Sequence, residues 1–370
     1  MRRPLYTAAQ AVPAQPCALP GGGEIVTAAY QIVPVTDVAT WNSAVLAAPR
    51  PDMLQSWEWG EFRREYGGWG VSRLVAMRDD EPLAGVQILS RRVSGVPFLY
   101  APRGPWWRDD DALKALLAWM RRKQAFRAPF LRVDPLIPDD KALRALGFRP
   151  SPQQIQPRAT ILVDLARDDD AIIEGFDRQV RYNARHALKK GVEVSEGGAE
   201  LIREFWQLLN STAERKGFVE RGADYYEQFL RHFAGSARVF LARYEDEAVY
   251  GAVIARFGQR AYYLYGASGG NRSVKPSELT QYRAMLWAKS QGATLYDMWG
   301  VPTHPTEDHP LYGTYRFKAG FGGVTETYAG AFDLPLTPLL GSATAAVEAL
   351  ALRSRSLARG QGFRIVDHLA

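Results

Sequence analysis

A lysine beside a phenylalanine and a glycine-rich run is the first feature of this chain that suggests chemistry. Lys318 follows Phe317 and precedes the glycine-rich run at 320–323. Glycine has no side chain, so a backbone and a ligand can approach each other closely at such a run. The positive charge of Lys318 could then stabilise an oxyanion or a phosphate group. The sequence therefore predicts Lys318 as the leading catalytic residue.

A second candidate is the basic segment at 178–190. The guanidinium group of Arg181 is a rigid fork of donors that fits phosphate oxygens. Arg185, Lys189 and Lys190 lie near one face of a helix by their i, i+4 spacing. A net charge of +6 and a pI of about 9.3 also favour a polyanionic partner. The alternative is a solvated basic face without a ligand.

Other kinds of site are not expected. Cys17 is the only cysteine, and the five histidines form no H-x-x-x-H pair, which argues against a disulfide framework and a zinc site. No Ser/His/Asp or Cys/His constellation is visible, and the glycine-rich runs lack the Walker and dinucleotide-binding patterns. We therefore expect neither a metal nor a cofactor.

The elements that must position these residues occur twice. Segments of similar pattern recur; they are 72–77, 83–86 and 98–101 in the first copy and 237–242, 250–253 and 263–266 in the second. Matching residues lie 163 to 166 positions apart, as in Gly85 and Gly251, Tyr100 and Tyr265, and Asp134 and Asp297. Each copy predicts the order β-β-β-α-β-α-β, which gives an α/β protein with mixed sheets and helices on both faces. A chain of 370 residues has room for two domains of ~150 residues.

This order predicts the domain boundaries. Residues 1–30, rich in Ala, Pro and Gly, are expected to be a loosely packed tail. The first domain spans 31–159 and the second 160–332, which includes one long helix expected over 170–186. Residues 333–370 have no counterpart in the repeat and are expected to pack back on the first domain. The alternative for this last segment is a basic amphipathic helix at a membrane surface.

The order of elements resembles the GNAT acyltransferase fold, which implies two GNAT-like domains in tandem. An acetyl-CoA-dependent GNAT enzyme needs an Arg/Gln-x-x-Gly-x-Gly/Ala loop whose N–H groups bind the pyrophosphate. Neither copy contains that loop. The resemblance therefore implies the fold without its usual cofactor site.

Six motifs narrow the resemblance further. They are QSWEWGEF at 55–62, YAPRGP at 100–105, RYNAR at 181–185, YLYGAS at 263–268, YDMWGVP at 296–302 and YRFKAGFGG at 315–323. Together they resemble the FemABX family of aminoacyl-tRNA-dependent peptidoglycan peptidyltransferases, over roughly residues 30–335. The chain resembles the compact type, because no heptad-rich coiled coil is inserted between 184 and 277.

The resemblance implies a reaction and its residues. An amino acid passes from aminoacyl-tRNA to the side-chain amine of a peptidoglycan stem peptide, on UDP-MurNAc-pentapeptide or a lipid-linked precursor. Lys318 and Phe317 would act in catalysis, and Tyr100, Arg103, Arg63 and Trp59 match precursor-binding positions of the family.

The other assignments come from the residues themselves. Arg181 is expected to contact the diphosphate of the precursor, and Tyr265 to line the cleft from the second domain. Arg185, Lys189 and Lys190 are expected to bind tRNA phosphates. Asp297, central and next to Trp299, is expected to make structural hydrogen bonds and not to act as a base.

The expected setting is a monomer in the cytoplasm, with contact to the inner face of the membrane left open. No run of ~18 apolar residues predicts a transmembrane helix. Three alternatives remain: the same tRNA donor with a small-molecule or peptide acceptor, an acyl-CoA-dependent GNAT enzyme, and a noncatalytic RNA-binding module.

Overall fold

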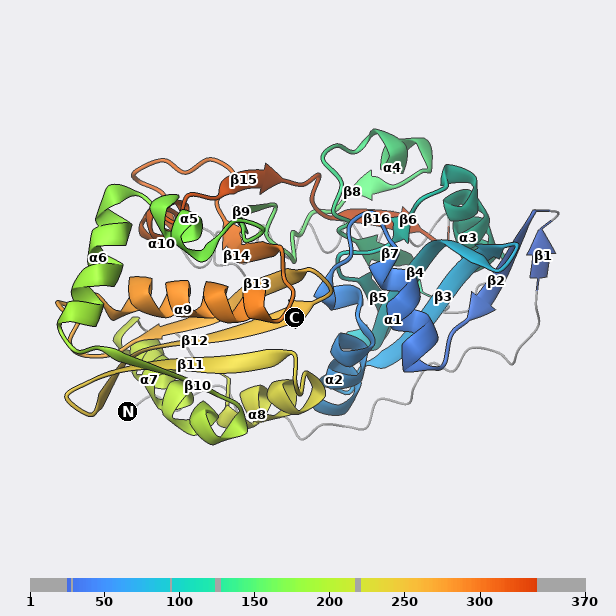
Figure 1. Ribbon diagram of the computed structural model, residues 1–370. Coiled ribbons are helices and arrows are strands. Elements are labelled where there is room, and N and C mark those ends of the chain that lie inside the picture. Colours follow the sequence, from blue (N-terminus) through green and yellow to red (C-terminus); the bar gives the residue numbers. More distant parts are fainter. Residues whose placement is uncertain (1–24, 28, 94, 124–127, 217–220, 338–370) are drawn as a thin grey trace.

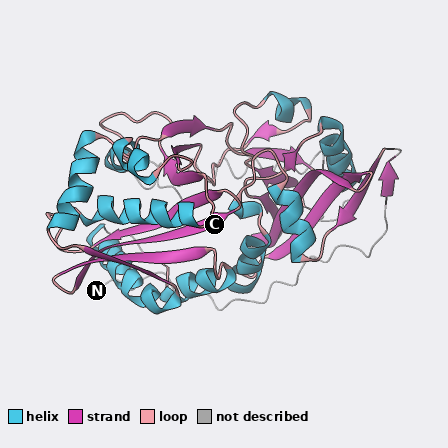
Figure 2. Ribbon diagram, in the orientation of Figure 1, coloured by secondary structure: helices cyan, strands magenta, loops and turns pink. Residues whose placement is uncertain are grey.

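Two mixed β-sheets, each covered by helices, make up the protein (Figures 1 and 2). The computed structural model describes residues 25–27, 29–93, 95–123, 128–216 and 221–337. Residues 25–150 and 332–335 supply the strands of the first sheet, and residues 159–327 supply those of the second.

The first sheet has the strand order β1-β2-β3-β4-β5-β7-β16-β8, and β6 also pairs with β4. Its strands are β1 Ile25–Thr27, β2 Tyr30–Pro34, β3 Gly70–Arg78, β4 Glu81–Val93, β5 Val96–Ala101, β6 Trp106–Trp107, β7 Phe130–Val133, β8 Arg149–Pro150 and β16 Phe332–Pro335. The accompanying helices are α1 Val38–Leu46, the short η1 Met53–Gln55, α2 Trp57–Gly67, α3 Asp110–Lys123 and α4 Lys141–Ala145.

The second sheet has the order β10-β11-β12-β13-β14-β9-β15. Its strands are β9 Ala159–Asp164, β10 Glu193–Gly197, β11 Ala237–Tyr244, β12 Glu247–Phe257, β13 Arg260–Ser268, β14 Leu295–Val301 and β15 Val324–Thr327. Its helices are α5 Asp169–Glu174, α6 Arg178–Lys189, α7 Ala199–Lys216, α8 Ala223–His232, α9 Pro276–Ser290 and α10 Tyr312–Ala319.

The predicted duplication is confirmed by the pairing of the strands. β3, β4 and β5 form an antiparallel meander, and β7 then pairs parallel to β5 after the crossover through α3. β11, β12 and β13 repeat the meander, and β14 pairs parallel to β13 after α9. The same supersecondary unit is thus present in both halves.

The first sheet takes one strand from the far end of the described chain. β16 lies between β7 and β8 of the first sheet, although it follows the last strand of the second. The carboxylate of Asp333 on β16 accepts two hydrogen bonds, of 2.8 and 2.9 Å, from the buried Arg132 of β7. Residues 332–335 therefore belong to the first sheet. Residues 338–370, including the expected amphipathic helix, lie outside the described part.

Two expectations about element boundaries were wrong. Strand β1 begins at Ile25 and pairs with β2, so regular structure starts inside the segment expected to be a tail. The helix expected over 170–186 is two helices, α5 and α6. Phe176 between them packs against Phe321, with ring centroids 5.1 Å apart, and Asp177 is extended at φ −52° and ψ 145°. This contact with a distant residue turns the chain where local periodicity predicted continuity.

One of the apolar cores is built from both halves of the protein. Along β11, Phe240 and Ala242 pack into the core beneath α9, whereas Val239 and Leu241 face the core that contains α7 and α8. This second core continues into α1 and α2 of the first half. Phe62 of α2 lies 5.1 Å from the Tyr225 ring of α8, measured between centroids. The junction of α2 and α8 therefore holds the two domains together.

Candidate functional site

Lys318 is buried near the C-terminal end of α10, with only 8% of its surface exposed. Its Nζ donates a hydrogen bond of 2.9 Å to the carbonyl oxygen of Gly300, and lies 5.7 Å from the centroid of the Tyr263 ring. Burial lowers the pKa of Lys318 to about 8, and the negative charge of Asp297 partly opposes this shift. A solvated surface lysine is therefore excluded. The amine is poised to hold or release a proton close to neutral pH.

Gly300, whose carbonyl oxygen accepts the hydrogen bond from Lys318, lies in an irregular stretch of β14. The pairing of β14 with β9 shifts register between Asp297 and Gly300, and Trp299 has a left-handed backbone with φ 61°. Gly300 has no room for a side chain, because a Cβ there would collide with the ring of Pro157. The irregular stretch fixes the direction of the Gly300 carbonyl group.

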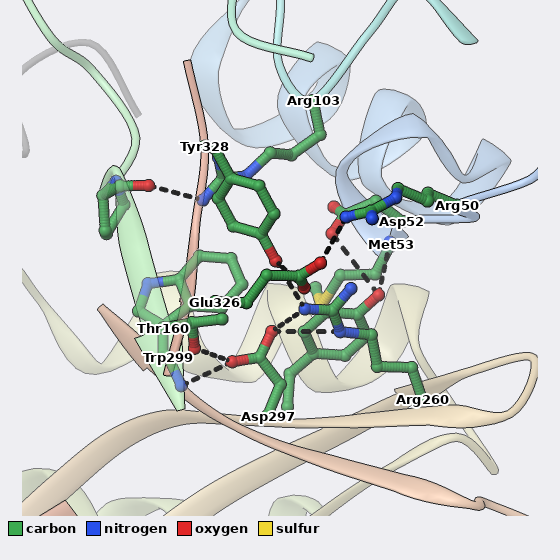
Figure 3. A network of polar contacts seen from close by, with 12 residues as sticks. Arg50, Asp52, Met53, Arg103, Thr160, Arg260, Asp297, Trp299, Glu326 and Tyr328 are labelled. Atoms are coloured by element: carbon green, nitrogen blue, oxygen red, sulfur yellow. Dashed lines mark hydrogen bonds and ion pairs between the residues drawn. The ribbon is translucent and has the colours of Figure 1, made fainter. Parts of the chain in front are cut away.

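Asp297 holds this stretch in place (Figure 3). Its carboxylate accepts a hydrogen bond from the hydroxyl of Thr160, one of 2.8 Å from the Trp299 N–H, and one of 2.7 Å from Nη2 of Arg260. Asp297 and Arg260 are both largely buried, so each charge compensates the other. The prediction that Asp297 makes structural hydrogen bonds is confirmed.

The glycine-rich run after Lys318 packs against protein, whereas the sequence suggested that it would admit a ligand. The N–H of Asp177 donates a 2.8 Å hydrogen bond to the Gly320 carbonyl, and a Cβ on Gly320 would press on Val180. Gly322, at φ 73°, lies against the carbonyl of Gly175. Phe317 is half-buried, and its ring centroid lies 5.2 Å from that of Phe321. The run therefore joins α10 to the corner between α5 and α6.

One nitrogen of Arg181, Nη1, makes its contacts within the protein. Its Nη1 donates to the carbonyl oxygens of Glu174 at 2.6 Å and Phe176 at 3.2 Å, and pairs with the Glu174 carboxylate at 3.3 Å. Arg181 thus satisfies carbonyl groups at the end of α5. Arg185 also pairs with Glu174, at 2.6 Å, whereas Lys189 and Lys190 are exposed.

Tyr100 and Arg103 are buried in a polar cluster of the first domain. The Tyr100 hydroxyl donates to Asp134 at 2.8 Å and accepts a bond of 3.1 Å from Gln156. Burial, followed by the charge of Asp134, raises the pKa of Tyr100 well above its ordinary value. The Arg103 N–H donates to Asp134 at 2.6 Å, and its Nη2 reaches the carbonyl of Pro157 at 3.0 Å. These residues fix the turn after β5 against the chain that enters β9.

Arg63, Trp59 and Tyr265 come together where α2 meets α8. The guanidinium carbon of Arg63 lies 5.7 Å from the Trp59 ring centroid and 5.6 Å from that of Trp69. The Tyr265 hydroxyl lies 2.9 Å from the hydroxyl of Tyr225. The structure thus brings together three residues that the sequence proposed separately, from both domains.

This junction also contains cations that the sequence analysis missed. Arg221 lies 4.4 Å from the Tyr225 ring centroid, and Arg91 lies 4.3 Å from that of Trp69. No motif marked them: Arg221 comes to the cluster through the docking of α8 on α2, and Arg91 comes from strand β4 of the first sheet. We call Arg63, Arg91, Arg221, Trp59, Trp69, Tyr225 and Tyr265 the Arg63 cluster.

Several donors of the Arg63 cluster lack acceptors. In the described part of the chain, Arg63 Nε, Arg91 Nε, Trp59 Nε1 and Trp69 Nε1 are buried without a hydrogen-bond partner. Burial, together with the nearby positive charge of Arg221, lowers the pKa of Arg63. Burying a cation without a counterion is costly. The cluster is therefore suited to bind an anion.

A small hollow opens at the start of α9. Its volume is about 190 Å³, and its lining includes Tyr250, Arg272 and Lys275. The Tyr250 hydroxyl lies 2.8 Å from that of Tyr263, whose ring centroid lies 5.7 Å from Nζ of Lys318. Two tyrosines therefore connect this hollow with the surroundings of the amine.

Two kinds of feature are absent from the described residues. No group of three or more His, Cys, Asp or Glu side chains there could hold a metal ion. None of the helices seen in that part has the length and apolar composition needed to cross a bilayer.

Comparison with known proteins agrees with this architecture. The lipid II:glycine glycyltransferase of Staphylococcus saprophyticus is 29% identical, over 82% of this chain and 92% of that protein. The enzyme of the same name from Staphylococcus aureus strain USA300 is 28% identical, over 80% and 90%. The crystal structure of FemX superposes with a TM-score of 0.78 at 25% identity, over 86% of this chain and 99% of that one.

The fold is also that of a tandem GNAT protein from the clavulanic acid biosynthesis pathway, with a TM-score of 0.52 at 14% identity, over 84% of this chain and 99% of that one. The predicted pair of GNAT-like domains is therefore confirmed. The model of the FemAB family matches residues 146–248 and 243–349, more than half of the sequence. The chain belongs to the FemAB family.

Proposed function

We propose that this protein transfers an amino acid from aminoacyl-tRNA to the side-chain amine of a peptidoglycan stem peptide, which builds the interpeptide bridge. Two staphylococcal relatives that align along most of both chains are named lipid II:glycine glycyltransferases. The proposed acceptor is the lipid-linked precursor, with soluble UDP-MurNAc-pentapeptide as the second form. The enzyme would work in the cytoplasm, at the inner face of the membrane that holds such a precursor.

The buried Lys318 is the observation that carries the proposal. The acceptor amine attacks the ester carbonyl carbon of aminoacyl-tRNA, and a tetrahedral oxyanion forms. The ester C–O bond then breaks, the ribose hydroxyl leaves with a proton, and an amide bond remains. At pH 7 a lysine with a pKa of about 8 is mostly protonated and has three N–H donors. One is directed at Gly300, and the others can stabilise the oxyanion.

The Arg63 cluster is the proposed site for the phosphates of the precursor. It offers buried donors without acceptors, and arginine suits phosphate geometry. The diphosphate contact that the sequence suggested for Arg181 is proposed instead for Arg63 and Arg91, whose Nε atoms are buried without a partner in the described part of the chain. Nη1 of Arg181 donates to carbonyl groups at the end of α5. Tyr100 and Arg103 would act indirectly, by fixing the turn beside Pro157.

The donor RNA would lie on the side of the second domain. Arg185, Lys189 and Lys190 are exposed on or just after α6, which packs against the run that follows Lys318. Their proposed contacts are phosphates of the tRNA. One copy of the chain holds both the Arg63 cluster and Lys318, so the proposal needs only a monomer.

Transfer assays test this proposal. The purified protein is incubated with labelled aminoacyl-tRNA pools and either UDP-MurNAc-pentapeptide or the lipid-linked precursor, and products are weighed by mass spectrometry. A precursor heavier by one or more aminoacyl residues is expected, and Lys318→Met should abolish it while Lys114→Met on exposed α3 should not. Product from acetyl-CoA alone, or from a non-precursor amine in preference, would contradict the proposal.

A further inference from the structure

One outward face of α6 combines an exposed aromatic ring with a row of cations. At about 100° per residue, Arg178, Tyr182, Arg185, His186 and Lys189 project from the same side of the helix. Tyr182 is 60% exposed, the highest value of any aromatic side chain among the exposed hydrophobic residues. A ring that is so exposed contributes little to the stability of the fold. Packing therefore does not explain why an aromatic residue stands among these charged residues.

The ring of Tyr182 is already arranged for stacking. It lies nearly parallel to the imidazole of His186, with centroids 5.8 Å apart and an interplanar angle of 25°. Nucleic-acid bases stack on such rings irrespective of sequence, whereas the neighbouring cations contact the backbone. An exposed aromatic ring within a basic face is therefore the chemistry that recognises unpaired nucleotides.

The cations of this face are largely unpaired. In the described part of the chain, Arg178 and Lys189 form no ion pair, and neither does Lys190, which follows the helix. Arg185 pairs with Glu174, but both side chains are more than half exposed, so the pair is weak and exchangeable. The face thus retains charge for phosphates.

The start of α6 contacts the glycine-rich run that follows Lys318. Asp177, just before α6, donates its N–H to the carbonyl of Gly320, two residues after Lys318. Val180 lies against Gly320, and Tyr182 follows within the same turn. Figure 1 shows α6 at one end of the second domain, with α5 and α10 beside its first turns. The face therefore leads away from Lys318 over the ~18 Å of a helix of this length.

A membrane surface fits this face less well. A helix that binds a bilayer presents a continuous apolar side to it. The apolar side of α6, with Ala184 and Ala187, is buried, and Asn183 there bonds to Glu278 of α9. Leu188 is exposed, but it projects about 120° around the helix from Tyr182. The two exposed apolar residues thus form no common patch.

We propose that Tyr182 stacks on an unpaired base at the 3′ end of the donor RNA, and that Arg178, Arg185 and Lys189 hold the adjoining phosphates. This proposal rests on the proposed aminoacyl-tRNA donor and deepens it. The aminoacylated terminus would reach Lys318, the unpaired nucleotides before it would lie on Tyr182, and the paired stem would begin near Lys190.

The test is direct binding by the full chain of two fluorescent hairpin RNAs. One has the acceptor-stem sequence with its unpaired 3′ extension, and the other is the same stem with a blunt end. Tyr182→Ala should weaken binding of the extended hairpin about 5- to 100-fold and leave the blunt hairpin unchanged. Tyr182→Phe, which keeps the ring, should bind like the wild type. Lys190→Gln, at the place proposed for the start of the paired stem, should weaken both hairpins equally and reduce the salt dependence of binding.

Equal losses on both hairpins with Tyr182→Ala, or no loss, would overturn the proposal. So would a loss of binding to vesicles of phosphatidylglycerol and phosphatidylcholine with RNA binding unchanged, which would assign the face to the membrane. The assay contains no acceptor. Extension-specific binding without transfer would therefore refute the proposed function alone, and transfer without such binding would refute this inference alone.

Discussion

The Nζ atom of Lys318 lies 2.9 Å from the carbonyl oxygen of Gly300. Gly300 lies in the stretch of β14 that is fixed by the hydrogen bonds of Asp297 with Thr160, Trp299 and Arg260, which we call the clamp. The hydrogen bond to Gly300 fixes the orientation of the ammonium group, and burial makes its charged form less stable than it would be in water. Both properties matter for the reaction, because the remaining N–H groups are aimed and the proton is held less tightly than in water.

The first prediction concerns the stability of the protein against pH. The pKa of Lys318 is lowered to about 8 from 10.5, so between these values the unfolded chain binds more protons than the folded chain. This group therefore opposes folding below pH 8 by up to about 3 kcal/mol, and the penalty fades as pH rises to 10.5. Lys318→Met should have a larger free energy of unfolding than the wild type at pH 7, and the gap should close near pH 10.5 in urea titrations. A gap that does not change with pH would contradict the buried cation.

The second prediction concerns the pH dependence of transfer. If the Lys318 ammonium stabilises the oxyanion, kcat should fall as pH rises through about 8, where the group loses its proton. Lys318→Arg keeps a positive charge over this range, so any activity it retains should lack that fall. The measurement is single-turnover transfer from preformed aminoacyl-tRNA between pH 6 and 9. A wild-type rate that climbs steadily across pH 8 would argue instead for Lys318 as a base.

The third prediction concerns the clamp. Asp297→Ala removes the partner of Arg260, which is itself mostly buried, and should cost about 3–5 kcal/mol of unfolding free energy. The matched control is Asp140→Ala, which removes the partner of the exposed Arg144 and should cost less than about 1 kcal/mol. Chemical denaturation of both variants gives the comparison. Similar losses in the two would mean that the clamp adds nothing beyond a surface pair.

The fourth prediction concerns the Arg63 cluster. Arg63→Ala should lower kcat/KM for the precursor about 10- to 100-fold, chiefly through KM, because a charged hydrogen bond contributes roughly 1.5–3 kcal/mol. Pyrophosphate should raise the melting temperature of the wild type and not that of the variant. Arg92→Ala, on the exposed neighbour of Arg91, is the control and should behave like the wild type. Loss in kcat alone would place Arg63 outside the binding site.

The fifth prediction concerns the junction of the domains. Phe62 is fully buried against Tyr225 and Phe229 of α8, so Phe62→Ala should cost about 3–5 kcal/mol. Because the core is shared, the wild type should unfold in a single transition. The variant should begin to separate the unfolding of the two halves, which calorimetry would detect as a broadened or divided peak. An unchanged melting temperature would show that the junction contributes little.

The sequence predicted those elements whose signal is local. The repeated segments 72–77 and 237–242 lie within strands β3 and β11, because a short apolar run needs no distant partner to be recognised. The break between α5 and α6 was missed because Phe176 packs on Phe321, far along the chain. The pattern of residues within 170–186 gives no sign of a contact with residue 321.

The same distinction applies to the site. Lys318 could be selected from its neighbours in sequence, but its burial and its bond to Gly300 come from the folding of β14. Arg181 was assigned to a ligand because its type suits phosphate, and the structure shows that its Nη1 also bonds to carbonyl groups at the end of α5. Arg221 reaches the cluster through the docking of α8 on α2, and Arg91 reaches Trp69 from strand β4, contacts that a single sequence does not reveal.

The return of β16 to the first sheet has a consequence for how the protein is made. A ribosome that has released residues through β8 has not yet synthesised β16, the strand that belongs between β7 and β8. Until it arrives, Arg132 lacks Asp333, and the edge of β7 is open. The N-terminal half therefore completes its sheet only after the strands of the second sheet have emerged, and a fragment that ends before β9 would lack the strand that closes its own sheet.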